Sequence, residues 1–423
     1  MSTDYSFIAA QDPEIYNAIL GEEKREQEGL ELIPSENYVS LAVRQANGSV
    51  FTNKYAEGYV GKRYYGGQEY VDVVERLGIE RACELFNCKY ANVQPLSGGP
   101  MNVAVYFGIL DVGDTVLGMD LSHGGHLTHG HPVTHVAKVF NFVRYKMKDP
   151  DTGEIDYEAL REVALREKPK LILAGFSAYT RELDYQKFVD IAKEVGAMTM
   201  MDASHIGGLI AGKACKNPFD YGFDIMTTTT HKSLRGPRGG LILTRDNEEI
   251  AKKIDRAVFP GLQGGPHIHT QAAKAIAFGE ALKPSFHAYS LQILKNAKAM
   301  EAVFKQEKIR LLCGGTDNHC LLADVFGSIG ITGGAAEEVL DEVGITLNKN
   351  SIADDVRSYM DPSGIRFGTP AITTRGFKEA DCARVAELMI QTMRSPSDAE
   401  LKKRVRAEIK EMCLARPVPE KFV

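Results

Sequence analysis

The chain has 423 residues, of which 44% are apolar and 25% charged, as in ordinary globular proteins, and this length predicts two or three domains. The formal net charge of −6 gives no basic footprint, so we expect no nucleic-acid partner. The first twenty residues lack the basic start of a secretory signal, and no stretch reaches the roughly 18 apolar residues of a membrane helix. We therefore expect none of the secreted, membrane, collagenous or disordered classes.

The cysteine and glycine contents narrow the class further. The seven cysteines are an odd number and include no C-x-x-C pair, which argues against a disulfide framework and a thiolate zinc site. The simplest expectation is a reducing compartment, the cytoplasm. Glycine is in excess with 40 residues whereas proline, with 17, is not. This imbalance indicates tight turns and close backbone contacts rather than a disordered linker.

The first part of the chain predicts an N-terminal arm followed by an aromatic loop. Residues 11–29 are acidic and amphipathic, with a helix start at Asp12-Pro13. A polar loop follows at 31–38, and residues 53–67 are dense in tyrosine, glycine and charge. Composition alone leaves two interpretations of this loop: its rings pack on their own domain, or they serve a site.

The middle of the chain alternates short apolar runs with helical patterns. This alternation predicts an α/β domain with a mostly parallel sheet covered on both faces. Ligands of such sheets bind beyond the carboxyl ends of the strands. Helices are expected at 70–90, 100–110, 159–168 and 187–196, and strands at 170–176, 197–203, 223–230 and 239–245.

The last part of the chain predicts a smaller α+β domain. Beyond a helix at 270–282 and a longer helix after it, strand-like and helical patterns follow one another. We expect an arm at 1–50, a large domain at 51–285 and a small domain at 286–423. The strands are expected at 319–325, 345–350 and 365–372, and the helices at 378–394 and 398–413.

A lysine after a threonine-rich strand is the sharpest chemical feature. The strand ends at Thr230 and presents His231 and Lys232 where the sheet would meet its ligand, and glycines and arginines follow. A lysine in such a place can form a Schiff base with a carbonyl cofactor. A solvated lysine beside a glycine turn is the alternative.

Two further segments complete a cofactor pattern. Asp202 ends an apolar strand thirty residues before Lys232, with His205 three residues later. Pyridoxal 5'-phosphate (PLP) needs a lysine at its aldehyde and a carboxylate at its ring nitrogen, although an aspartate at this place can also cap a helix. Small residues at 97–99, followed by Pro100, suit a phosphate-binding helix N-terminus.

A histidine cluster at 123–135 invites a metal site. Its spacing allows two ligands, but the glycines and the lack of a paired carboxylate weaken this interpretation. We expect no metal. Four of the histidines are predicted to be ordered loop or surface residues, namely His123, His129, His131 and His135.

With these features in place, the chain resembles the serine hydroxymethyltransferase family over nearly its whole length. That resemblance implies the fold-type-I PLP-enzyme architecture, with PLP in the large domain. The motifs that carry the resemblance, in chain order, are SENY (35–38), NKYAEGY (53–59), GKRYYGG (61–67), NVQPLSG (92–98), HGGHLTHG (123–130), the aspartate–histidine strand (202–205), TTTTHK (227–232), GPRGG (236–240), FPGLQGGP (259–266), GGTDNH (314–319) and GTPAITTRGFKE (368–379).

The resemblance implies cofactor contacts residue by residue. Lys232 would carry PLP as a Schiff base, Asp202 would pair with the ring nitrogen, and His126 would stack on the ring. Implied at the phosphate are Ser97, Gly98, Gly99 and His231, together with Gly264 and Gly265 from a partner subunit. Implied at the 3′-oxygen are Ser177 and His205. The remaining implied cofactor contacts are Arg238 and, from the same partner subunit, Tyr55.

The resemblance also implies substrate contacts and a reaction: reversible transfer of the serine hydroxymethyl group to tetrahydrofolate, giving glycine and 5,10-methylenetetrahydrofolate. Arg366 would hold the substrate carboxylate, a task suited to a planar two-pronged donor. Glu57 would be the acid–base group near the serine hydroxyl. Lys232, Asp202, His231 and Tyr65 would share the catalytic work, Ser35 and Tyr65 would line the substrate pocket, and Tyr64, Leu121, Gly125, Leu127 and Asn348 would face the folate.

Cofactor contacts shared between two subunits imply a homodimer or a dimer of dimers.

The chain departs from the family at Gly99, where a serine is usual, and at Ser204, Ser233 and Val60, where alanine, threonine and proline are usual. The missing Gly99 hydroxyl predicts weaker cofactor retention, by about 1 kcal/mol.

Two alternatives remain open. One is a folate-independent aldolase, or a hydroxymethyltransferase for another β-hydroxy or α-methyl amino acid. The other is a catalytically quiet binding protein, for example for RNA, which the net charge of −6 and the pairing of Asp202 with Lys232 disfavour.

Overall fold

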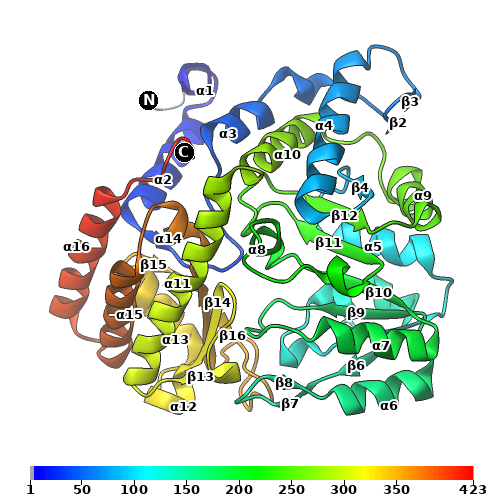
Figure 1. Cartoon of the computed structure of the whole chain (residues 1–423). Helices are drawn as coiled ribbons and strands as arrows, with labels where there is room; N and C mark the ends of the chain where they lie inside the picture. Colours follow the sequence, from blue (N-terminus) through cyan, green and yellow to red (C-terminus); the bar gives the residue numbers. More distant parts are fainter. Residues whose placement is uncertain (1–3, 423) are drawn as a thin grey trace.

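The computed structural model describes residues 4–422, and a seven-stranded sheet forms the centre of its larger part (Figure 1). Neighbouring strands are parallel except at β12, which runs antiparallel to both of its neighbours. The predicted α/β fold with a mostly parallel sheet is therefore confirmed. From edge to edge the strands are β4 (Tyr90–Asn92), β12 (Gly240–Thr244), β11 (Ile225–Thr229), β10 (Met198–Asp202), β9 (Leu171–Gly175), β5 (Thr115–Met119) and β6 (Asn141–Tyr145).

Helices cover both faces of this sheet, which is why its inner strands read as uninterrupted apolar runs. Successive side chains of β9 point to opposite faces: Ile172 belongs to one buried cluster and Leu173 to another. The first face is covered by α4 (Glu69–Phe86), α6 (Tyr157–Glu167) and α7 (Tyr185–Val195), and the second by α5 (Gly98–Ile109) and α9 (Glu248–Arg256).

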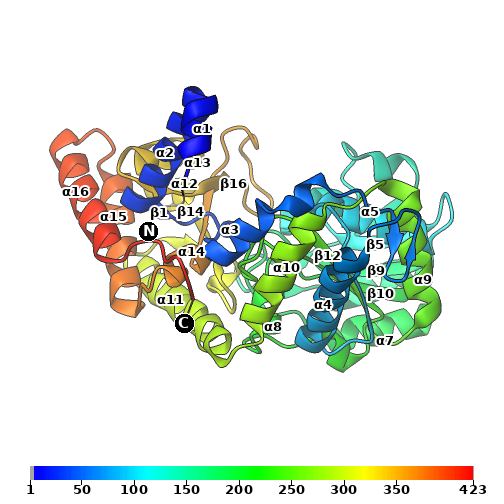
Figure 2. The same cartoon turned by 90° about the horizontal axis from the view of Figure 1, so that it is seen from above.

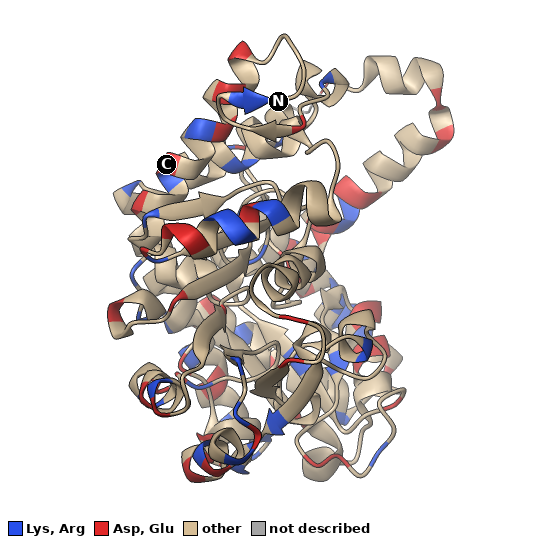
Figure 3. Ribbon diagram, turned by 90° about the vertical axis from the view of Figure 1, so that its right-hand side faces the viewer, with Lys and Arg blue, Asp and Glu red and all other residues tan. Residues whose placement is uncertain are grey.

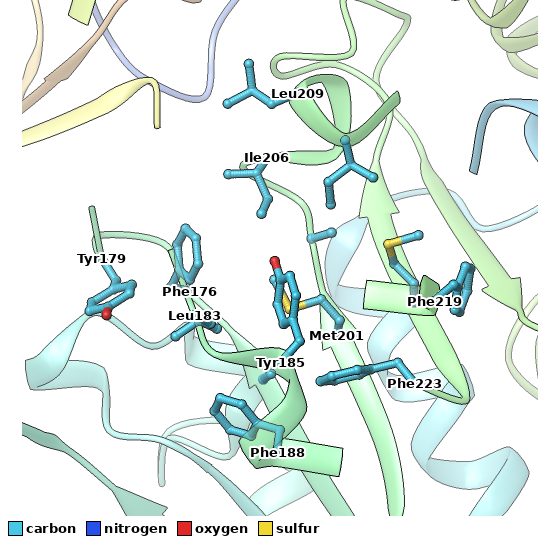
Figure 4. Packing of buried hydrophobic residues seen from close by; sticks show 14 of the residues in the cluster. Phe176, Tyr179, Leu183, Tyr185, Phe188, Met201, Ile206, Leu209, Phe219 and Phe223 are labelled. Atoms are coloured by element: carbon cyan, nitrogen blue, oxygen red, sulfur yellow. The ribbon is translucent and has the colours of Figure 1, made fainter. Parts of the chain in front are cut away.

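Aromatic side chains dominate the packing between α7 and the sheet (Figure 4). The rings of Tyr185 and Phe223 meet edge-on with centroids 5.6 Å apart, and Phe188 lies 6.4 Å from Phe223. Met201, the residue before the end of β10, is fully buried in the same cluster. This packing fixes β10 so that its last residue, Asp202, emerges at the carboxyl edge of the sheet.

A second, antiparallel sheet forms the core of the C-terminal part, in the order β13 (Arg310–Leu311), β14 (Cys320–Asp324), β17 (Gly364–Gly368) and β16 (Asn348–Asn350). The strand expected at 365–372 ends early, because Pro370 begins α14 (Pro370–Thr374) and proline suits the first turn of a helix. The helices of this part include α11 (Pro284–Gln306), α13 (Gly333–Glu342), α15 (Glu379–Arg394) and α16 (Ala399–Ala415).

The first segment of the N-terminal arm, up to residue 31, is tied to this C-terminal part (Figure 2). Helix α2 (Pro13–Glu28) begins as expected, because Asp12 accepts hydrogen bonds from the first free backbone amides. Next, β1 (Leu30–Glu31) pairs in parallel with β15 (Ile345–Thr346), and Leu30 is buried in the C-terminal core. The domain boundaries at residues 50 and 285 remain predictions.

Acidic and basic residues are interspersed along the chain (Figure 3). All seven cysteines are free, as expected. Within residues 4–422, none of the helices combines the length and the apolar character needed to span a bilayer. The other elements are α1 (Ser6–Gln11), α3 (Leu41–Asn47), α8 (Gly207–Ala211), α10 (Ile268–Ala281), α12 (Val325–Ile329), β2 (Gly58–Tyr59), β3 (Lys62–Arg63), β7 (Met147–Asp149) and β8 (Glu154–Ile155).

Candidate active site

A cavity of about 460 Å³ lies at the carboxyl ends of β10 and β11 and reaches β17 of the second sheet. It collects most of the residues that the sequence singled out, although they span more than 300 positions of the chain. Its walls are formed by Ser35, Glu36, Ser97, Gly98, Gly99, Asn102, His126, Phe176, Ser177, Asp202, Ser204, His205, Thr229, His231, Lys232, Arg238 and Arg366.

Asp202 and Lys232 meet here because their strands are neighbours. β10 and β11 run parallel, and Asp202 pairs in register with Thr227, so both strands end at the same edge of the sheet. Lys232 follows three residues after Thr229, the last residue of β11. Two sequence segments separated by thirty residues therefore place a carboxylate and an amine in one cavity, as predicted.

Asp202 is almost fully buried and is held by hydrogen bonds to both of its oxygens. Its Oδ2 accepts from Nδ2 of Asn102 at 2.9 Å and from Nε2 of His129 at 3.0 Å. Its Oδ1 accepts from the backbone amide of Ser204 at 3.1 Å and from the Ser204 hydroxyl at 2.6 Å. Every donor comes from the chain's own packed elements, so the orientation of the carboxylate is fixed.

The charge of Asp202 follows from these contacts. The backbone amide of His126 donates to Nδ1 of His129, so Nε2 of His129 carries the hydrogen that points at Asp202. Burial alone would raise the pKa of Asp202, but the hydrogen bond of His129, together with that of Ser204, holds this pKa well below its usual range. The carboxyl group is therefore ionised throughout the physiological pH range.

Lys232 lies close to this carboxylate but is easier to deprotonate than an ordinary lysine. Burial lowers the pKa of Lys232 to about 8; Asp202 opposes the shift, and Arg366 and Arg238 add to it. The turn that carries Lys232 is held by its backbone carbonyl, which accepts from Nδ2 of Asn37 at 3.0 Å and from the amide of Arg235 at 3.0 Å. A substantial fraction of this amine is therefore neutral, and nucleophilic, near pH 8.

The start of α5 lines the cavity and has features that suit an anion. Ser97 is the N-cap of this helix, and its hydroxyl makes no capping hydrogen bond. A Cβ at Gly98 would lie 3.0 Å from Cγ2 of Thr229, a tight contact that would require this side chain to shift, whereas a Cβ at Gly99 would meet nothing closer than Thr128 at 3.8 Å. Free amides at a helix N-terminus attract phosphate groups. His231 lines the same cavity, and its buried Nδ1 has no hydrogen-bond partner among residues 4–422.

Neutral histidines line other walls. Burial lowers the pKa of His126 to about 4, and its Nδ1 lies 2.7 Å from the Thr128 hydroxyl. Burial also holds the pKa of His205 well below its usual range, and this ring stacks on His319 with centroids 5.5 Å apart. These rings offer flat faces and neutral nitrogens rather than positive charge.

Arg366, in contrast, brings a cation to the cavity from β17. Its Nη1 donates to the backbone carbonyl of Ser177 at 2.9 Å and its Nε to Oδ1 of Asn348 at 3.1 Å. Within residues 4–422 no carboxylate forms an ion pair with it. A guanidinium fixed in this way, with its charge uncompensated, is suited to binding a carboxylate ligand.

A second group of predicted residues lies outside this cavity. Tyr55 donates to Oε1 of Glu57 at 3.1 Å, its ring meets that of Tyr65 edge-on at 5.5 Å, and a Cβ at Gly265 would touch the same ring. Tyr55 and Tyr65 are both more than half exposed. Gly264 adjoins Glu57, and the exposed Tyr64 packs edge-on against Phe259.

The remaining predicted residues lie on two short turns and on the second sheet. Leu121 and Leu127 are exposed on neighbouring 3-10 turns, at 121–123 and 127–129. Gly125 lies between these turns, where a Cβ would come 2.4 Å from the carbonyl of Met119. Asn348 orients Arg366, as described above.

Two expectations about the histidine cluster can be compared with the structure. His123 and His129 lie on ordered 3-10 turns, as the prediction of ordered loop or surface residues allowed, but both are almost fully buried, and His129 contacts Asp202. The expectation that the cluster lacks a paired carboxylate is wrong. The carboxylate missing from the sequence pattern is supplied by β10, and ligand atoms of His126, His129 and Asp202 lie within 4.8 Å of one another. Hydrogen bonds among these groups and their neighbours account for that proximity.

Comparison with known proteins gives one consistent result. A family model described as serine hydroxymethyltransferase matches residues 8–389. A protein of Francisella tularensis subsp. novicida named serine hydroxymethyltransferase is 53% identical over 407 residues, covering 96% of this chain and 97% of its own. A protein of Francisella philomiragia subsp. philomiragia with the same name is 52% identical over 407 residues, with the same coverage.

Proposed function

The chain belongs to the serine hydroxymethyltransferase family, and from this premise we propose that it reversibly transfers the hydroxymethyl group of serine to tetrahydrofolate, giving glycine and 5,10-methylenetetrahydrofolate. The observation that carries the proposal is the convergence of Asp202, Lys232 and the start of α5 on one cavity. The family match does not favour a folate-independent aldolase or a quiet binding protein.

The cavity has the donor set that PLP requires. Lys232 offers an amine with a lowered pKa to the aldehyde, Asp202 offers a permanent negative charge to the ring nitrogen, and the amides at Gly98 and Gly99 offer donors to the phosphate. The unpartnered Nδ1 of His231 is one further polar atom for this ligand. Ser97, His126, Ser177, His205 and Arg238 line the same space and complete the proposed cofactor contacts.

When bound, PLP supplies the electron sink that stabilises negative charge at the amino acid's Cα. The protein's part is to keep the ring nitrogen protonated through Asp202 and to orient the substrate. Arg366 would grip the substrate carboxylate from β17, at a fixed position set by Ser177 and Asn348. Holding the carboxylate fixes the orientation of the bond to be broken. Ser35, which lines the same cavity, would contact the substrate.

The group around Tyr55 would serve the active site of a partner subunit. Its position outside this chain's own cavity, and its exposure, support this assignment. Glu57 would then be the acid–base group at the partner's serine hydroxyl, beside Tyr65. Gly264 and Gly265 would approach the partner's phosphate, and the smallest active unit would be a homodimer. Folate would lie against Tyr64, Leu121, Gly125, Leu127 and Asn348. The expected cellular location of the protein is the cytoplasm.

Absorbance spectroscopy tests the cofactor assignment. PLP added to the protein should give a visible band that borohydride bleaches, and Lys232→Ala should lack this band and fail to convert serine to glycine. Arg235→Lys, which changes a nearby cation on the same turn, serves as the matched control and should keep the band. A borohydride-resistant band, or one that persists in Lys232→Ala, would contradict the assignment of Lys232.

A further inference from the structure

The carboxylate of Asp202 uses all of its acceptor capacity within the protein. An ionised carboxylate offers about four lone-pair sites. Four donors occupy them: Asn102 and His129 at Oδ2, and the amide and hydroxyl of Ser204 at Oδ1. A fifth donor can form a full hydrogen bond with this carboxylate only if one of the four gives way.

Three of these donors are fixed in place. The Asn102 amide accepts from the Thr227 hydroxyl at 2.8 Å through Oδ1, and it donates to Thr128 at 2.9 Å as well as to Asp202. His129 cannot move its hydrogen, because its other ring nitrogen accepts from the backbone. The Ser204 amide belongs to the main chain. None of these three can leave Asp202 without leaving a buried N–H unpaired.

The Ser204 hydroxyl is different because its hydrogen turns about a single bond. It makes the shortest of the four contacts, at 2.6 Å, and Ser204 lines the cavity itself. Only its hydroxyl can therefore turn away from Asp202 toward another acceptor, such as water in the cavity, without leaving a buried N–H unpaired. The position of Ser204 is also one at which the chain differs from the alanine that is usual in the family it resembles.

We propose that the Ser204 hydroxyl is a displaceable donor, which fills the fourth acceptor position of Asp202 before the cofactor binds and yields it to the ring N–H of PLP. The proposal rests on the proposed function, in which Asp202 pairs with that ring nitrogen. Ser204 is a positioning residue in this scheme, because it acts on the cofactor only through Asp202.

The scheme predicts the sign of a mutational effect. A contact made only in the cofactor-free protein stabilises that form and opposes binding by the same amount. Ser204→Ala removes the contact, so the variant should bind PLP about fivefold more tightly than wild type, as expected for one hydrogen bond. If the Ser204 hydroxyl stayed on Asp202 both with and without PLP, Ser204→Ala would bind PLP more weakly than wild type or equally well.

The experiment titrates full-length protein with PLP and records thermal midpoints with and without saturating PLP. Ser204→Ala should lower the dissociation constant about fivefold and lower the midpoint of only the cofactor-free protein. Ser204→Thr keeps the hydroxyl and should restore the wild-type dissociation constant and thermal midpoint. Ser204→Gly also removes the hydroxyl and replaces Ser204→Ala in the experiment should that variant not fold. The control is Ser290→Ala: this buried hydroxyl donates to the carbonyl of Phe286 at 2.9 Å, away from Asp202, so PLP affinity should not change.

Each outcome decides the question. Tighter PLP binding by Ser204→Ala, reversed by Ser204→Thr, supports the proposal. Equal or weaker binding by Ser204→Ala, when wild type binds PLP normally, overturns it and leaves the proposed function intact. Failure of the wild-type protein to bind PLP overturns both.

Discussion

Restoring a hydroxyl at Gly99 should strengthen cofactor binding, and the structure allows the size of this effect to be worked out. Gly99 is the second residue of α5, in the turn whose amides are free for a phosphate. It has a backbone conformation open to any residue, and a Cβ there would meet only Thr128, at 3.8 Å. Gly99→Ser should therefore be accommodated without strain.

The magnitude follows from one added hydrogen bond. A serine hydroxyl at this position can donate to the phosphate, and the net gain for one such bond is about 1 kcal/mol, or about a fivefold lower dissociation constant for PLP. Serine is also a better helix former than glycine by about 0.5 kcal/mol. That second effect stabilises the protein with and without PLP equally, so it raises the thermal midpoint and leaves the affinity unchanged.

The assay measures PLP dissociation constants by absorbance titration for wild type, Gly99→Ser and Gly99→Ala. The alanine variant is the matched control, because it supplies the helix propensity and the Cβ without the hydroxyl. We expect Gly99→Ala to bind PLP like wild type and Gly99→Ser to bind about fivefold more tightly. Equal affinities of the serine and alanine variants would refute the reasoning that Gly99 costs this chain a phosphate donor.

Four further predictions follow from the site and its supports. Arg366→Lys should lower kcat/KM for serine about 30-fold, or about 2 kcal/mol, because the two-pronged contact is lost; a loss below threefold would argue against this role. The rate of PLP uptake should rise about tenfold per pH unit up to the Lys232 pKa of about 8 and then level off, because only the neutral amine reacts; a flat profile from pH 6 to 9 would contradict it. The ammonium group of Lys274, a buried residue of α10, donates to the backbone carbonyls of Val93, Pro95 and Gly240. Lys274→Met should lower the unfolding free energy measured in urea by about 3 kcal/mol or more, because these three carbonyls lose their donor. An unchanged midpoint would show that they find other partners. Lys232→Ala and Tyr55→Ala chains mixed in equal amounts should recover about a quarter of wild-type activity. Half of the dimers are then hybrids, and in each hybrid one of the two sites combines an intact Lys232 with an intact Tyr55. No recovery in verified hybrids would exclude shared sites.

The sequence predicted those parts of the fold and the site that depend on local patterns. The runs ending at Asp202 and Thr230 placed two strands, and the rule for parallel sheets placed Asp202 and Lys232 at one edge. The helix start at Asp12 followed from its capping chemistry. These features depend on residues close in the chain, for which periodicity and capping are direct signals.

Long-range contacts were not predictable in the same way. The pairing of β1 with β15 joins segments more than 300 residues apart, and no local pattern reports it. His129 and Asn102 were missed as supports of Asp202 because their roles arise only when α5, the turn at 127–129 and β10 come together. One signal was available for Asn102: it lies one helical turn after Gly98 and therefore faces the same side of α5.

The central claim is tested most directly by measuring the conversion of serine to glycine by the PLP-loaded protein with and without tetrahydrofolate, with α-methylserine and threonine as parallel substrates. We expect tetrahydrofolate to accelerate serine cleavage strongly and to be consumed in equal amount to the glycine formed, with serine preferred over the other two substrates. Serine cleavage at the same rate without tetrahydrofolate, or a preference for α-methylserine or threonine, would contradict the proposed function.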